Sequence, residues 1–203
     1  FMDAQVTMYV QEVDAGYSAP GLTALTDTRT YGGSLSMPIA GRLSVGAKMD
    51  TREQLLGLDT NATEVNLGYK FNDNWDLSAG YRMDELIDNS TIVALTQEEG
   101  ERAVAVLQVG YSSFSNWNTY AFVQDTVSTT GNRRENGRAG LGVSFQVSDK
   151  LKIDAEVSDG DLGAGGRLGT NYLVSDNTSM YLNYALDNER ADNGMAMTQG
   201  NEG

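Results

Sequence analysis

The residues of this sequence that could perform chemistry are carboxylates, because histidine and cysteine are both absent. Asp154 and Glu156 stand two residues apart in an alternating segment, so both would project from one face of a strand. Such a pair can divide the roles of general acid and general base. However, the usual general base, the commonest transition-metal ligand and any thiol nucleophile are missing. We therefore interpret the two carboxylates as partners of basic side chains and predict no enzyme.

The overall charge limits the partners that the chain can bind. The 203 residues carry a formal net charge of -14, and no basic stripe is present that would neutralise phosphates. The sequence therefore predicts no nucleic-acid partner. Acidic residues gather in connecting segments such as 85–101, and carboxylates are ligands for divalent cations. Surface divalent cations are accordingly the only cofactor that we consider, and no resident cofactor is predicted.

The charged residues are set within segments in which apolar and polar residues alternate. Around the turn at 72–74, Leu67 and Tyr69 alternate with Lys70 on one side, and Trp75 alternates with Asp76 on the other. A period of two places one set of side chains on each face of a strand. The predicted strands are residues 5–13, 29–39, 42–50, 61–71, 75–84, 102–112, 117–126, 138–147, 151–158, 166–174 and 180–187. In the segment 117–126 the facing stays open, because Trp117, Ala121 and Val123 compete with Tyr120 and Phe122 for the apolar face.

Connections between the predicted strands alternate in length. Short turns fall near residues 40, 73, 116, 149 and 176, whereas polar connections such as 14–27, 51–60 and 85–101 are longer. Aromatic residues gather beside the short turns, as in an interfacial girdle of a membrane protein. The aromatics assigned to the membrane interface are Tyr69, Phe71, Trp75, Phe145 and Tyr172. Strands of about ten residues also match the span of a tilted transmembrane strand.

Two architectures can use strands of this kind. In a soluble β-sandwich the apolar faces point inward, whereas in a membrane barrel they point outward to lipid and the polar face lines the lumen. Charges at mid-strand favour the barrel, because a hydrated lumen tolerates them. The predicted fold class is therefore all-β, an antiparallel up-and-down transmembrane β-barrel, with a soluble β-sandwich interaction domain as the alternative. The predicted pore-lining residues are Arg42, Lys48, Glu64, Lys70, Asp76, Arg82, Arg102, Arg138, Lys152, Asp154, Glu156 and Arg167.

Four segments around the short turns resemble the hairpins of bacterial outer-membrane β-barrel proteins. They read GYKFNDNWDLSAGY, GYSSFSNWNTYAF, SFQVSDKLKIDAEV and TNYLVSDNTSMYLNYAL. The resemblance is one of general pattern, and it implies the outer membrane of a Gram-negative bacterium with lipid and lipopolysaccharide as partners. It implies a porin-like passive channel or a structural barrel. The alternative is a membrane anchor or subunit of a surface adhesin or secretion assembly, which would add other subunits or a passenger domain as partners.

The strand count predicts that the chain is a partial segment. Single-chain bacterial barrels have an even number of strands, whereas eleven to twelve are seen here and the end of the sequence is polar. We expect residues 1–188 to form barrel strands and loops. Residues 189–203 are expected to be a polar loop or tail that continues to a further strand of a larger barrel.

Overall fold

The computed structural model describes residues 4–19, 22–23, 26–90, 99–175 and 178–186, in which the regular secondary structure is entirely β. None of these residues belongs to a helix long and apolar enough to cross a membrane. Eleven strands form one antiparallel sheet, in which each main strand is hydrogen-bonded to the next along the chain. The predicted all-β, up-and-down class is therefore confirmed, whereas the predicted tail 189–203 lies outside the described residues.

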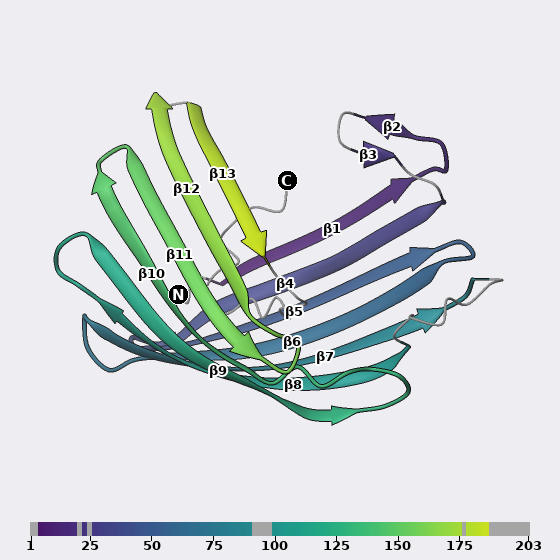
Figure 1. The fold of residues 1–203 in the computed structure, drawn as a ribbon, viewed down its shortest axis with the longest axis horizontal. Helices are drawn as coiled ribbons and strands as arrows, with labels where there is room; N and C mark the ends of the chain where they lie inside the picture. Colours follow the sequence, from purple (N-terminus) through teal and green to yellow (C-terminus); the bar gives the residue numbers. More distant parts are fainter. Residues whose placement is uncertain (1–3, 20–21, 24–25, 91–98, 176–177, 187–203) are drawn as a thin grey trace. The chain divides into compact units, whose positions relative to one another are not determined.

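The main strands agree closely with the alternating segments of the sequence. They are β1 (Gln5–Val13), β4 (Thr28–Ala40), β5 (Leu43–Gln54), β6 (Leu58–Lys70), β7 (Trp75–Asp88), β8 (Gly100–Ser112), β9 (Trp117–Thr129), β10 (Arg138–Ser148), β11 (Leu151–Gly160), β12 (Gly165–Ser175) and β13 (Thr178–Leu186). Within the predicted loop 14–27, β2 (Ser18–Ala19) and β3 (Leu22–Thr23) pair as a separate two-stranded sheet beyond the end of β1 (Figure 1).

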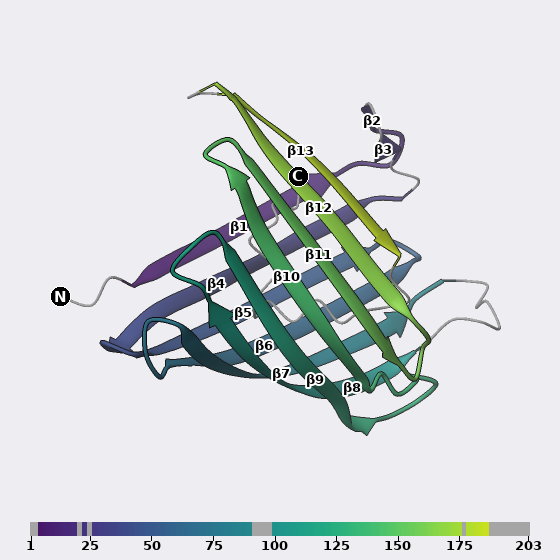
Figure 2. The same ribbon diagram turned by 60° about the vertical axis from the view of Figure 1, so that its left-hand side comes forward.

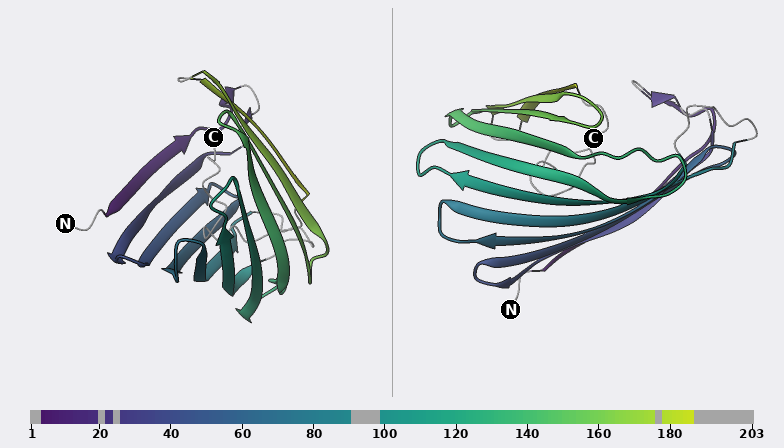
Figure 3. Two further views of the ribbon diagram at one scale, coloured as in Figure 1. Left: turned by 90° about the vertical axis from the view of Figure 1, so that its left-hand side faces the viewer. Right: turned by 60° about the horizontal axis from the view of Figure 1, so that its bottom comes forward.

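The chain divides into two compact units. Unit 1 comprises Phe1–Leu67, Gly80–Val104 and Thr126–Arg134, and unit 2 comprises Gly68–Ala79, Ala105–Asp125 and Glu135–Gly203. In unit 1, the purple to blue strands β1, β4 and β5 lie side by side (Figures 1 and 3). In unit 2, β10 to β13 do the same (Figure 2). The strands β6 to β9 contribute residues to both units.

The strand registers keep each set of alternating side chains on one face. Shifts of register in the paired strands occur at Pro38/Ala40, Gln146/Ser148 and Leu173/Ser175, each beside a short turn. Along the rest of these ladders the register runs without interruption, so alternate residues stay on the same face across neighbouring strands. The faces predicted by period-two alternation can therefore be compared directly with the exposure of each side chain.

The connection between β5 and β6 is shorter than the sequence predicted. The polar loop expected at 51–60 is wrong, because β5 continues to Gln54 and β6 begins at Leu58. Only three residues join the two strands, and Leu56 takes the left-handed backbone of a tight connection with φ of 55°. The hydrogen bonds between β5 and β6 continue beyond the residues in which apolar and polar side chains alternate. Hydropathy alone therefore predicts strands that are too short at this end.

Candidate functional site

Exposed apolar side chains occur on every main strand of the sheet. One example from each strand, in order, is Val6, Leu35, Met49, Val65, Met83, Leu107, Val123, Val143, Val157, Leu168 and Leu182. The opposite face carries buried polar side chains, among them Glu64, Arg102, Gln124, Arg138 and Glu156, each no more than 6% exposed. A water-soluble domain places charged residues outside and large apolar ones inside. The distribution here is the reverse, and it is the arrangement of a barrel wall whose outer face meets lipid.

An ion-pair network lies on the polar face of unit 1. This Asp84 network consists of Glu64 on β6, Arg82 and Asp84 on β7, Arg102 on β8, and Arg133 in the connection between β9 and β10. Arg133 Nη2 donates to Asp84 Oδ2, while Arg102 Nε and Arg82 Nε lie 3.6 and 4.0 Å from Asp84 Oδ1. Arg82 Nη1 also lies 3.8 Å from Glu64 Oε2. Three guanidinium groups therefore lie beside the carboxylate of Asp84, and one of them also lies beside that of Glu64.

The Asp84 network is largely removed from solvent. The side chains of Glu64, Arg102 and Arg133 are only 5 to 6% exposed, and that of Asp84 is 10% exposed. Taking a charged group out of water costs several kcal/mol unless a partner compensates for it. Asp84 faces three guanidinium groups, so its carboxylate is the group on which the network depends most.

Aromatic side chains of β9 lie across glycines of β10 on the polar face of unit 2. The ladder pairs Tyr120 with Gly142, and Gly142 with Glu156. A Cβ atom on Gly142 would lie 2.0 Å from the Tyr120 ring, so the ring occupies that space, and its hydroxyl donates to Glu156. Phe122 covers Gly140 in the same way, with a ring carbon 2.5 Å from the position of a Cβ. Glycine here makes room for a neighbouring ring.

These contacts resolve the facing of β9, which the sequence left open. Phe122 is buried on the polar face, whereas Trp117, Ala121 and Val123 are exposed on the opposite face. The deciding feature is the pair of glycines on the neighbouring strand, because they accommodate two large rings on the polar side. Hydropathy along β9 alone contains no such information.

The predicted pore-lining residues differ in exposure. Glu64, Arg102, Arg138 and Glu156 are buried; Lys48, Asp76, Arg82, Asp154 and Arg167 are half-buried; Arg42, Lys70 and Lys152 are exposed. Arg42 lies in the turn before β5, so the predicted start of that strand is one residue too early. Of this set, the structure brings Glu64, Arg82 and Arg102 into one network, and Lys48 pairs at 3.1 Å with Asp50. Their role in lining a pore stays a prediction.

Two members of the Asp84 network are absent from the predicted set. Alternation placed Asp84 on the polar face, but this residue lies near the predicted end of its strand and was not named among the pore-lining residues. Arg133 lies in a connection, where alternation gives no indication of facing. The adjacent basic pair of Arg133 and Arg134 beside Gly131 is the one feature of the sequence that could have drawn attention to this segment.

Asp154 and Glu156, which share the polar face of β11, have separate surroundings. Asp154 lies over Gly169, since a Cβ there would be 2.4 Å from Asp154 Oδ2, and Glu156 accepts a hydrogen bond from the Tyr120 hydroxyl. Arg138 Nη1 donates to Ser158 Oγ at 3.1 Å on the same face. These contacts are those of side chains that hold one another along a wall, and the prediction of no enzyme is unchanged.

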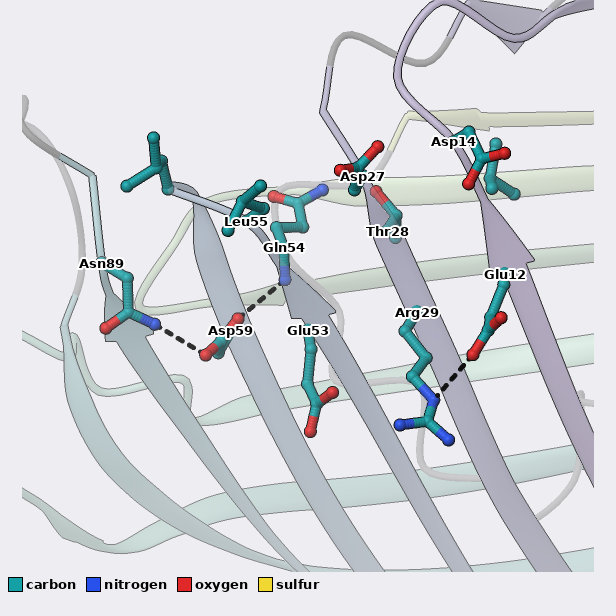
Figure 4. A pocket seen from close by; sticks show the side chains of 12 residues that line it. Glu12, Asp14, Asp27, Thr28, Arg29, Glu53, Gln54, Leu55, Asp59 and Asn89 are labelled. Atoms are coloured by element: carbon teal, nitrogen blue, oxygen red, sulfur yellow. Dashed lines mark hydrogen bonds and ion pairs between the residues drawn. The ribbon is translucent and has the colours of Figure 1, made fainter.

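An acidic cavity of about 650 Å³ lies in unit 1 (Figure 4). It is lined by the last residues of β1 and β5, the first residues of β4 and β6, and the connection 55–57. Its carboxylates are Glu12, Asp14, Asp27, Glu53 and Asp59. Several already have protein partners: Arg29 Nε lies 3.2 Å from Glu12, and Asn89 Nδ2 donates to Asp59 at 2.6 Å. Among the described residues, no group of three or more acidic side chains is placed to hold a metal ion. Surface divalent cations therefore stay a prediction.

Aromatic residues assigned to a membrane interface are all exposed near short turns of unit 2. They are Tyr69, Phe71, Trp75, Phe145 and Tyr172. Some are in contact with other rings: Tyr69 and Phe71 have centroids 5.1 Å apart, and Trp75 and Trp117 lie on either side of Tyr111 at 4.9 and 5.4 Å. Exposed rings thus lie beside the short turns, and their place at a membrane interface stays a prediction.

An up-and-down antiparallel sheet with an exposed apolar face and a buried polar face has the fold of outer-membrane β-barrels. Solved structures that share it include a transporter and a porin. The toluene transporter TodX of Pseudomonas putida is 12% identical, with a TM-score of 0.51 over 91% of this chain and 72% of that chain. KdgM porin is 12% identical, with a TM-score of 0.50 over 89% of this chain and 90% of that chain. No protein-family model matches the sequence, and no curated protein matches it.

Proposed function

We propose that this chain forms the wall of a passive channel in the bacterial outer membrane. Its apolar face contacts lipid and lipopolysaccharide, and its polar face borders a hydrated path along which small hydrophilic solutes diffuse. The charges of the polar face, including the Asp84 network, act on the solutes that pass. The porin and transporter folds of the two structural neighbours support a channel-like barrel.

The observation that carries this proposal is the reversed distribution of apolar and charged side chains. Met8 on β1 is 82% exposed and Leu141 on β10 is 60% exposed, whereas Arg138 at the start of β10 is 4% exposed. A soluble β-sandwich would pack its apolar faces together. The exposure pattern therefore disfavours the sandwich alternative, and lipid is the environment in which such a face is stable.

The test is electrical recording of the purified full chain in planar lipid bilayers. We expect stepwise single-channel conductance, and a Lys152→Glu variant should shift the permeability ratio toward cations, because exposed polar-face charges select ions. Lys152 is exposed on the polar face of β11. An Ile153→Val variant, which changes the neighbouring residue on the apolar face, should leave the ratio unchanged. A chain that inserts into lipid but never conducts would contradict the channel and leave a structural barrel.

A further inference from the structure

We propose that residues 130–134, at the start of the connection between β9 and β10, form an anchored segment that holds a selectivity residue, Arg133, on the polar face. The Arg133–Asp84 ion pair is the anchor of the side chain. The effect on selectivity rests on the proposed channel, whereas the anchoring does not depend on it.

The backbone of the anchored segment is fastened to the beginning of β8. Thr130 N donates to Glu101 O at 2.8 Å, and Asn132 N donates to Glu99 O at 2.7 Å. In return, Glu101 N donates to Thr130 Oγ1 at 2.9 Å. These three bonds extend the pairing of β9 with β8 past the last residue of β9, so the segment continues the wall.

Two glycines allow this close approach. Gly100 and Gly131 both have positive φ, at 122° and 64°. A Cβ on Gly131 would lie 2.3 Å from Glu99 O, and a Cβ on Gly100 would lie 2.2 Å from Thr130 O. Any other residue at either position would push the two backbones apart and strain the chain.

Because these hydrogen bonds hold the backbone of the anchored segment, one of its two adjacent arginines is buried. The side chain of Arg133 is 5% exposed and donates to Asp84, whereas Arg134 is exposed. Arg82 lies on β7 and Arg102 on β8, and the hydrogen bonds between strands fix their backbones. Their position in the network therefore does not depend on the charge of residue 84. Arg133 belongs to a connection, so its burial depends on the carboxylate that compensates for the cost of desolvation.

The position of Arg133 also explains how it would act on solutes. It adds a third guanidinium beside the carboxylates of Glu64 and Asp84. Fixed arginines at the wall of a pore favour anions over cations. Removal of Arg133 should therefore weaken any preference for anions, while removal of Arg134 should not.

The anchoring is tested by limited proteolysis of the full chain folded in detergent micelles, in which trypsin reaches the connections at both ends of the strands. In an Arg134→Gln background, Arg133 is the remaining trypsin site within residues 130–134. We expect slow cleavage after Arg133, and acceleration of about tenfold or more when Asp84→Asn is added, because the neutral side chain no longer compensates for burial of the guanidinium. Cleavage after exposed Lys150 serves as the internal reference. Fast cleavage in the background, or no acceleration by Asp84→Asn, would overturn the anchor.

A second variant keeps the test decisive if Asp84→Asn does not fold. Thr130→Ala removes the hydroxyl acceptor of Glu101 N–H and should also accelerate cleavage after Arg133, to a smaller extent. An unchanged rate would count against anchoring.

The effect on selectivity is measured separately in planar bilayers. Arg133→Gln should change the permeability ratio toward cations by roughly twofold, and Arg134→Gln should not. An unchanged ratio with Arg133→Gln would refute the selectivity role. If no variant conducts but proteolysis behaves as expected, the anchor stands and the channel is refuted.

Discussion

An Asp84→Ala variant should be about 3–5 kcal/mol less stable to unfolding than the natural chain, because it leaves buried arginines without their shared carboxylate. Arg133 donates to this carboxylate, and Arg102 lies 3.6 Å from it. The measurement is urea-induced unfolding of the protein in lipid vesicles, followed by tryptophan fluorescence.

The matched control is an exposed ion pair in the same unit. Glu12 lies 3.2 Å from Arg29, and their side chains are 66% and 56% exposed. Such surface pairs contribute little, so Glu12→Ala should cost less than about 1 kcal/mol. Equal losses in the two variants would show that burial does not distinguish the Asp84 network, and would contradict our account of its energetics.

A Val143→Arg variant should lose about 2–4 kcal/mol of stability in a bilayer, because it places a charge near mid-strand on the surface that we propose to face lipid. Val143 lies in the middle of β10, is 43% exposed, and pairs with Thr119 and Ala155 on its neighbours. The same urea titration in vesicles measures the loss.

The adjacent residue on the opposite face is the control for this substitution. Ser144 pairs with Asn118 and Asp154 on the polar face, where an arginine would meet a carboxylate and water. Ser144→Arg should therefore cost clearly less than Val143→Arg. If Val143→Arg were the better tolerated of the two, the apolar face would not be in contact with lipid.

Alternation allowed the sequence to predict the strands and most of their facings. The first strand was predicted at 5–13 and is found at Gln5–Val13, because alternation there extends over the whole element. β9 could not be oriented in this way, because Tyr120 and Phe122 turn to the polar face in response to glycines on β10, far from them in the sequence. The cause is a tertiary contact, which the local pattern does not contain.

The candidate site was predicted only in part, for a related reason. Glu64, Arg82 and Arg102 lie on strands, so alternation identified them as polar-face residues before their contacts were known. Arg133 reaches the same face through backbone bonds between its connection and β8. A basic residue in a loop normally stays in water, and nothing in its neighbours along the sequence predicts burial against Asp84.

The exposed apolar face of this sheet is the surface that we propose to meet lipid, and the two tryptophans allow a direct test without any substitution. Trp75 and Trp117 are exposed beside short turns and lie on either side of Tyr111. The measurement is quenching of their fluorescence, with the chain inserted in vesicles whose lipid chains carry bromine at defined depths. Our account predicts strong quenching by bromine near the headgroups and weaker quenching by bromine near the bilayer centre, because tryptophan favours the interface. Fluorescence unaffected by bromine at any depth would contradict it.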